Sequence, residues 1–159
     1  MKSLRAVDTI TGSSGMGYGI IDGNVEEFLW AIEIEAKIEK EKSEIPIMGR
    51  KNKGNKANGV KMTGKMKLYY VTSLFRKKMI EYVKTGKDFY FDLVVTNEDP
   101  SSSAGKQSVV LKGVNIDSVI IAKLDADATE LDEDVDFTYE DVDLLSEFNK
   151  VEGQEIGGW

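Results

Sequence analysis

Hydrophobic and polar residues alternate along two segments of this chain, residues 30–38 and 60–70. In the first segment the even positions are apolar, and the odd positions from residue 33 onward are charged. In the second segment the even positions hold apolar residues or glycine, and most odd positions hold lysine or threonine. A period of two is typical of a β-strand with one buried face and one solvated face. The pattern therefore predicts two long strands of this kind.

One antiparallel register satisfies both strands, and in it the numbers of facing residues sum to 100. On the solvated face this register predicts three pairs of opposite charge: Glu39 with Lys61, Glu35 with Lys65, and Glu33 with Lys67. On the buried face it predicts four apolar pairs: Ile38 with Met62, Ile34 with Met66, Ile32 with Leu68, and Trp30 with Tyr70. A slip by one residue would bury the charges, and each charged pair contributes about 0.2–1 kcal/mol. We expect this hairpin, interrupted at most by a bulge.

The segment between the two strands, residues 40–59, is rich in lysine, asparagine and glycine, and we expect it to be a long loop. A compact domain rarely keeps a loop of this length unless the loop has a function. A short hairpin is predicted to turn at Asp22-Gly23, because glycine tolerates the positive φ of a type I′ turn. Further strands are expected at residues 89–96, 108–116, 118–124 and 136–142, with an exposed loop at residues 97–106.

A single helix is predicted after the second long strand. Thr72 or Ser73 caps its N-terminus, it runs to about Lys84, and Gly86 lies just beyond its end. Helical spacing predicts a buried stripe made of Phe75, Met79, Tyr82 and Val83.

These elements predict a mainly β (α+β) fold. We expect an antiparallel β-sandwich or barrel of about seven strands with one packed α-helix. A length of 159 residues and a hydrophobic content of 41% suit a single core. One domain is expected over residues 1–143, followed by a C-terminal tail, residues 144–159, with a short helical turn and no assigned role.

Charge is sorted into two blocks along the chain. Residues 45–80 contain ten Lys/Arg and no acid, whereas residues 124–149 contain eleven Asp/Glu and no base. A small domain with a basic and an acidic region carries both partners of an electrostatic contact. Head-to-tail association with further copies is the simplest use of this arrangement, and it yields closed rings or open filaments.

Composition also limits the chemistry. The chain has no Cys and no His, so it lacks disulfides, thiolate nucleophiles and the commonest general base and metal ligand. No catalytic residues or cofactors are expected, and the chain is not expected to be an enzyme. The N-terminus lacks the apolar region of a secretion signal, and no apolar run approaches the length of a membrane span. We expect a protein of the cytoplasm in which it is made, with no stable membrane association.

Three motifs suggest ligands but fit them poorly. The glycine-rich run at residues 12–19 lacks the Lys-Ser/Thr of a phosphate loop. Residues 125–136 resemble a calcium loop in carboxylate spacing, but Glu130 and Asp136 occupy the positions that require Gly and Glu. The basic residues 50–67 lack stacking aromatics, which argues against a nucleic-acid site. A soluble acidic binding module for calcium or nucleic acid stays open as an alternative.

Several segments together resemble a known family: DTITG, IIDGNVEE, IEKEKSEIPIMGR, VTSLFRKKMIEYVKTG with FYFDL, and VNIDSVIIAKLDADATELDEDVDFTYEDVD. Their order is similar to that in the tail tube protein family of the defective prophage PBSX, related contractile phage tails and phage-tail-like bacteriocins. The resemblance covers residues 8–143. It implies a structural subunit of a virion tail or tail-like particle, assembled in the bacterial host cytoplasm.

The resemblance further implies that six subunits form a ring, each giving strands to an inner β-barrel, and that rings stack into a hollow tube. Expected partners are the sheath, the tape measure protein, the baseplate and the tail terminator, with DNA passing transiently through the lumen in a phage. A ring subunit of a type VI-like secretion apparatus is the related alternative.

Four sets of residues are expected to serve this assembly. The lumen face is expected to comprise Glu33, Glu35, Lys37, Glu39, Lys61, Thr63, Lys65 and Lys67. The inter-ring loop is expected to comprise Ile47, Met48, Gly49, Arg50, Lys51, Lys53 and Lys56. The acids expected to receive these bases in a neighbouring subunit are Asp132, Glu133, Asp134 and Asp136. The sheath contact is expected to involve Arg76, Lys77 and Lys78.

Overall fold

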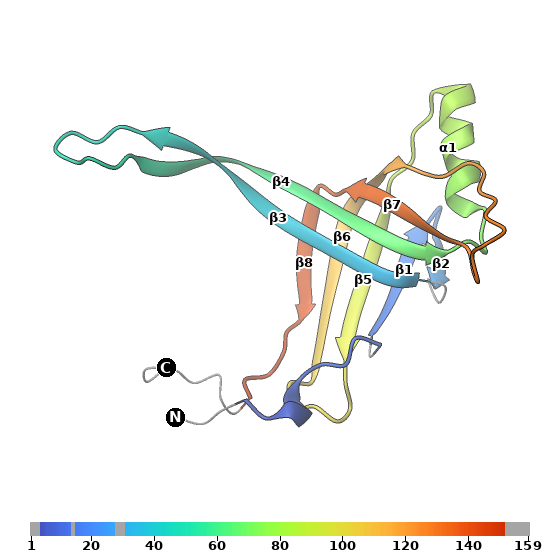
Figure 1. Cartoon of the computed structure of the whole chain (residues 1–159), viewed down its shortest axis with the longest axis horizontal. Coiled ribbons are helices and arrows are strands. Elements are labelled where there is room, and N and C mark those ends of the chain that lie inside the picture. The colour runs from blue at the N-terminus through green and yellow to red at the C-terminus, as the bar shows by residue number, and fades with distance from the viewer. Residues whose placement is uncertain (1–3, 14, 28–30, 152–159) are drawn as a thin grey trace.

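The computed structural model describes residues 4–13, 15–27 and 31–151 (Figure 1). Within these ranges the chain forms one short 3-10 helix, one α-helix and eight strands. Their bounds are η1 (Ala6–Asp8), β1 (Gly15–Ile21), β2 (Asn24–Glu27), β3 (Ala31–Ile45), β4 (Gly54–Tyr69), α1 (Leu74–Thr85), β5 (Phe91–Glu98), β6 (Lys106–Ser118), β7 (Asp132–Thr138) and β8 (Asp141–Ser146).

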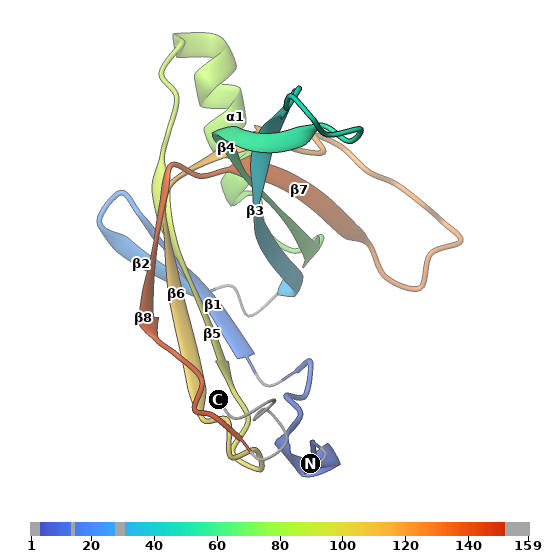
Figure 2. The same ribbon diagram turned by 90° about the vertical axis from the view of Figure 1, so that its left-hand side faces the viewer.

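The strands form two antiparallel sheets that share β6. The first sheet has the order β2-β1-β5-β6-β8, and the second has the order β3-β4-β7-β6. In Figure 1 the first sheet runs down the view and the second runs across it, and Figure 2 shows the two from the side. Strand β6 leaves the first sheet and enters the second near Gly113, whose φ of 67° is a conformation that favours glycine.

The core lies where the two sheets cross. Its fully buried side chains come from β4, β5, β6 and β7: Met66, Leu68, Leu93, Val114, Val135 and Phe137. Helix α1 covers one end through Phe75, whose ring centroid lies 6.0 Å from that of Phe91. The mainly β fold with one packed helix is as the sequence predicts, with eight strands in place of about seven.

The predicted register of the long hairpin is confirmed from Glu33 to Glu41. A bulge before Glu33 shifts the pairing, so that Leu68 faces Ala31, and the predicted pair of Ile32 with Leu68 is wrong. The predicted pair of Trp30 with Tyr70 involves a residue outside the described ranges.

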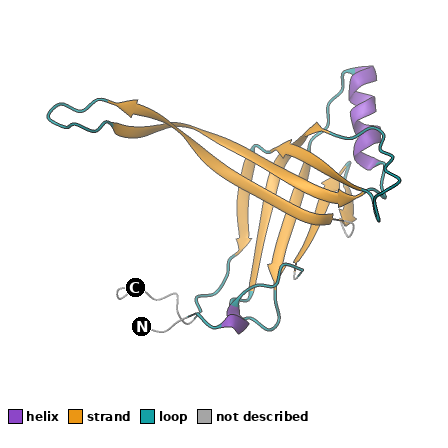
Figure 3. Ribbon diagram, viewed as in Figure 1, coloured by secondary structure: helices purple, strands orange, loops and turns teal. Residues whose placement is uncertain are grey.

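The long loop predicted for residues 40–59 is wrong. Strands β3 and β4 continue to Ile45 and from Gly54, and only residues 46–53 connect them (Figure 3). A second bulge follows Glu41, beyond which the facing pairs no longer sum to 100. Backbone pairing continues although the alternation has ended, because ladder hydrogen bonds need no particular side chains.

Predictions for the shorter elements have mixed outcomes. The turn at Asp22-Gly23 is confirmed, with φ values of 52° and 80° that suit a type I′ turn. The strand predicted at residues 118–124 is wrong, because residues 119–131 form a loop without regular structure. The strand predicted at residues 136–142 is instead two strands, β7 and β8. Strand β8 extends to Ser146 and pairs with β6, so residues 144–146 form part of the sheet.

Helix α1 begins and ends close to the predicted positions. The Leu74 amide donates to Thr72 Oγ1 at 3.3 Å, and Gly86 terminates the helix in the left-handed conformation with φ of 75°. The predicted buried stripe is only half right: Phe75 is buried, whereas Tyr82 and Val83 are exposed. The second half of the helix extends beyond the sheets, so helical periodicity there does not produce burial (Figure 1).

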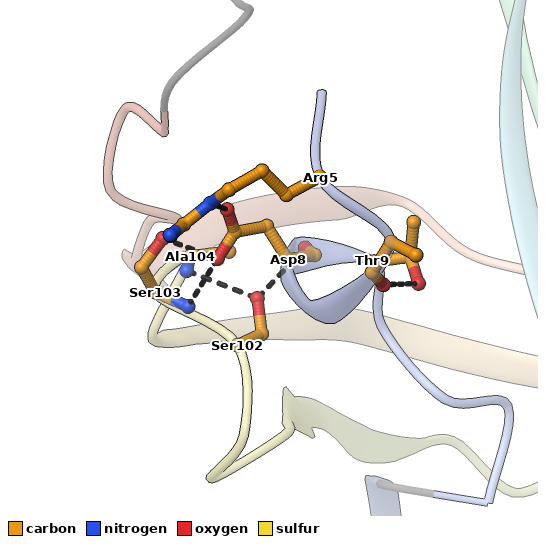
Figure 4. A network of polar contacts seen from close by, with 7 residues as sticks. Arg5, Asp8, Thr9, Ser102, Ser103 and Ala104 are labelled. Atoms are coloured by element: carbon orange, nitrogen blue, oxygen red, sulfur yellow. Dashed lines mark hydrogen bonds and ion pairs between the residues drawn. The ribbon is translucent and has the colours of Figure 1, made fainter. Parts of the chain in front are cut away.

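The N-terminal segment is attached to the loop between β5 and β6 (Figure 4). Buried Asp8 accepts hydrogen bonds from the amide and hydroxyl of Ser103 at 3.0 and 2.6 Å, and from Arg5 Nε at 2.9 Å. These bonds, led by the Ser103 hydroxyl, lower the pKa of Asp8 to about 2. Asp99 anchors the same loop, since it accepts from the amides of Thr11 and Ser101.

Candidate assembly surfaces

The solvated face of the β3-β4-β7 sheet is built from rows of facing residues. Two rows carry acid, lysine and acid: Glu33–Lys67–Asp134 and Glu35–Lys65–Asp136. The next rows along the strands are Lys37–Thr63–Thr138 and Glu39–Lys61. All eight residues predicted for the lumen face therefore share this surface. Asp134 and Asp136 join it too, because β7 pairs with β4, which the sequence pattern did not reveal.

Ion pairs on this face run diagonally or along a strand. Lys65 Nζ lies 3.7 Å from Glu33 Oε1, and Lys37 Nζ lies 2.8 Å from Glu39 Oε1. Hydrogen bonding in the latter pair raises the pKa of Lys37 and lowers that of Glu39. Because these side chains are about half exposed, solvent screens both pairs and each contributes little to stability.

The charges of these four rows almost cancel. The acids are Glu33, Glu35, Glu39, Asp134 and Asp136, and the bases are Lys37, Lys61, Lys65 and Lys67. Five acids and four bases leave a net charge of −1. The surface is therefore hydrated and nearly neutral, with a slight excess of negative charge.

Glu133 points to the opposite face and is buried. Its Oε2 accepts a hydrogen bond from Arg76 Nη1 at 2.7 Å, and the two side chains are 3% and 12% exposed. Burial raises the pKa of Glu133, while the Arg76 guanidinium opposes that rise. Because Glu133 is buried in this pair, its carboxylate is not accessible to a neighbouring subunit. The guanidinium of Arg76 is likewise not accessible to a sheath.

The other predicted acids are partly engaged within the chain. Asp132 lies 3.5 Å from Lys123 Nζ and 3.9 Å from Lys67 Nζ. Asp134 and Asp136 are exposed, but they face Lys67 and Lys65 of the same chain. The acidic strand β7 is thus paired mainly with the basic strand β4 of its own domain.

The outer part of the long hairpin, residues 38–60, is named here the arm. It projects from the body, and none of its residues is buried (Figure 1). The predicted inter-ring residues all lie on it: Ile47, Met48, Gly49, Arg50, Lys51, Lys53 and Lys56. Gly49 has φ of 81° in the turn at the tip, where the Arg50 amide donates to the Ile47 oxygen at 3.2 Å. A two-stranded hairpin without a covering layer is marginally stable in water, so the arm is suited to a partner.

The predicted sheath residues on α1 differ in exposure. Lys77 is exposed, whereas Lys78 forms a hydrogen bond with Asp22 of the β1–β2 turn, which raises the pKa of Lys78. The outer half of the helix also exposes the apolar side chains of Ile80, Tyr82 and Val83, of which the sequence analysis had assigned Tyr82 and Val83 to the buried stripe.

The described ranges offer little support for the metal and membrane sites considered from the sequence. They contain no group of three or more carboxylates placed to hold a metal ion. Residues 125–136, considered above as a calcium loop, are divided between an exposed loop and strand β7. No helix in these ranges is long and apolar enough to span a membrane.

Comparison with known proteins identifies the family. Residues 2–146 match the family model described as DUF2001, phage tail tube protein, and the match ends at the last residue of β8. The phage-like element PBSX protein XkdM of Bacillus subtilis (strain 168) is 44% identical over 142 residues, which is 89% of this chain and 94% of that protein.

Two solved assemblies contain chains with the same fold. A chain in the baseplate of the anti-feeding prophage superposes with a TM-score of 0.66 at 12% identity, covering 86% of this chain and 95% of that one. A chain in the extended sheath-tube complex of an extracellular contractile injection system gives a TM-score of 0.61 at 10% identity, covering 86% and 90%. The family match over nearly all of the domain and the close relative lead to one conclusion: this chain belongs to the phage tail tube protein family.

Proposed function

We propose that six copies of this chain form a ring and that the rings stack into the inner tube of a contractile phage tail or phage-tail-like particle. The observation that carries this proposal is the open edge of strand β3. It is 15 residues long, and in the described ranges it pairs on one side only, with β4. A long open edge promotes association, and closure of the sheets into a barrel removes it.

In this barrel the solvated face of the β3-β4-β7 sheet lines the lumen. Its rows of alternating charge hold water and present nearly balanced charge, so a polyanion finds few places to adhere. Such a wall suits the passage of DNA and the enclosure of a tape measure protein.

The role proposed is structural and not catalytic. The sheath is the expected outer partner, because a chain of the same fold lies in a sheath-tube complex. Contacts with a baseplate and a terminator are expected at the two ends of the tube, with assembly in the host cytoplasm. The family match favours a tail tube over a ring of a type VI-like apparatus.

Negative-stain electron microscopy of the purified chain over a range of concentration tests the proposal. Hollow tubes or six-fold rings of uniform width are the expected result, with sedimentation giving a mass of six subunits per ring. Monomers that persist at high concentration and after addition of preformed tail fragments would overturn the proposal.

A further inference from the structure

The two ends of the molecule carry opposite charge. The tip of the arm lies at one end of the long axis, and the loop between β6 and β7, residues 119–131, lies at the other (Figure 1). The arm tip carries Arg50, Lys51, Lys53 and Lys56, all exposed. The β6–β7 loop carries Asp125, Asp127 and Glu130, also exposed.

Most of these charged side chains lack an ion-pair partner among the described residues. In the part of the chain that the structure describes, Arg50, Lys51 and Lys56 form no ion pair, and Lys53 lies 3.7 Å from a largely exposed Glu44. The three acids of the loop likewise form no ion pair with any described residue. Of the acids that follow directly in the sequence, Asp132 lies near Lys67 and Lys123, and Glu133 is paired with Arg76, so the acids of the loop are more accessible than these two.

Each end also presents an unpacked apolar side chain. Met48 at the arm tip is 100% exposed and Leu124 in the loop is 95% exposed, the highest values among the large hydrophobic residues described. The loop spans 13 residues without regular structure, a length that in compact domains is usually tied to function. Each of the two ends therefore combines a charged surface with an exposed apolar side chain, and the charges of the two ends are opposite.

We infer that the arm tip of one copy docks on the β6–β7 loop of a second copy, with Met48 against Leu124 and the basic residues facing Asp125, Asp127 and Glu130. Two different surfaces at opposite ends of one molecule make a heterologous contact that repeats along a line. The contact thus joins successive rings, and in this respect the inference rests on the proposed tube. It replaces the sequence-based expectation that the arm meets Asp132, Glu133, Asp134 and Asp136.

Cysteine pairing provides the test, because the chain has no cysteine of its own. A variant with Met48→Cys and Leu124→Cys is assembled and oxidised, and a ladder of covalently linked subunits is expected on a denaturing gel. The control variant combines Met48→Cys with Val83→Cys, since Val83 is also highly exposed, at 76%, but lies on α1. This control is expected to give no ladder.

The outcomes separate this inference from the proposed function. Tubes that form without a ladder, or with equal ladders in both variants, would overturn the docking and leave the tube intact. Failure to associate at all, even with tail fragments present, would overturn both.

Charge reversal adds an independent readout. Lys51→Glu with Lys53→Glu is expected to weaken each arm contact at least about tenfold, and added salt should weaken the native contact as well. When Asp125→Lys and Asp127→Lys are added to this double variant, the original tube length is expected to return, because the two surfaces again carry opposite charge. The matched control, Lys77→Glu with Lys87→Glu, makes the same change in net charge on and next to α1 and should leave tube length unchanged. Equal loss in both double variants would contradict the inference.

Discussion

The buried ion pair between Arg76 and Glu133 yields the sharpest prediction about stability. Arg76 joins α1 to β7 through its 2.7 Å bond to Glu133, and it also donates to the backbone oxygens of Thr72 and Ile120. Its guanidinium carbon lies 4.2 Å from the centroid of the Tyr70 ring. Arg76→Met keeps most of the side-chain volume but leaves the buried Glu133 carboxylate without its hydrogen-bonded counter-ion, with Lys123 as the remaining nearby positive charge.

The expected loss of stability is large. Removing one partner of a buried ion pair costs about 3–5 kcal/mol, because the remaining charge is still desolvated. For a chain of this size each kcal/mol lowers Tm by about 2–4 °C, so a loss of 3 kcal/mol lowers it by about 6–12 °C. The matched control is the exposed pair of Lys112 and Asp143, whose side chains are 45% and 52% exposed. Lys112→Met breaks this pair and should cost much less stability than Arg76→Met, because solvent screens an exposed pair.

The loss should depend on pH in a defined direction. Burial already raises the pKa of Glu133, and removal of Arg76 raises it further. When the folded pKa of a carboxyl lies above its unfolded value, the folded state binds more protons, so its stability increases as pH falls. The defect of Arg76→Met is therefore expected to shrink between pH 7 and pH 5.

Urea unfolding of the unassembled protein, followed by circular dichroism at both pH values, measures these effects. The double variant Arg76→Met with Glu133→Leu should recover most of the loss, because no buried charge remains. A loss below 1 kcal/mol at pH 7, or an equal loss at pH 5, would show that Glu133 is hydrated and that the reasoning is wrong.

Three further predictions concern the hairpin and the N-terminus. Gly64→Ala places a Cβ against the Phe137 ring and 2.9 Å from a β3 backbone oxygen, so the free energy of unfolding in urea is expected to fall by about 1–3 kcal/mol. The control Gly12→Ala is expected to cause no loss, because its Cβ meets no atom within 4 Å. Asp8→Asn should lower Tm at pH 7, and by much less at pH 2, where Asp8 is already partly protonated. The native contribution is present above the unfolded pKa of 3.8 and is lost as pH falls through the folded value of about 2, which thermal scans across this range would detect. Either single reversal, Glu35→Lys or Lys65→Glu, is expected to cost roughly 0.2–1 kcal/mol of stability. The double variant exchanges the two charges and should recover most of that loss, which a double-mutant cycle would measure.

Local pattern alone predicted the body of the hairpin. Between Glu33 and Glu41 the alternation sets which side chains share a face, and opposite charges on facing strands select one register. Prediction failed at the arm, where side chains no longer alternate and only the backbone keeps the strands paired. It failed again on α1, where Tyr82 and Val83 follow helical spacing but extend beyond any packing surface.

Sequence determined that this chain separates basic from acidic charge, contains no Cys or His and forms a two-faced hairpin, because these properties depend on residue type and short spacing. Tertiary structure decided which charges remain free. Pairing of β7 with β4 sets Asp134 and Asp136 opposite the lysines of β4, and packing of α1 buries Glu133 with Arg76. Both contacts join residues distant in the chain, and the free energy of burial that selects them comes from the whole core. That the bases of the arm tip and the acids of the β6–β7 loop lie exposed at opposite ends of the molecule is visible only after that packing is known.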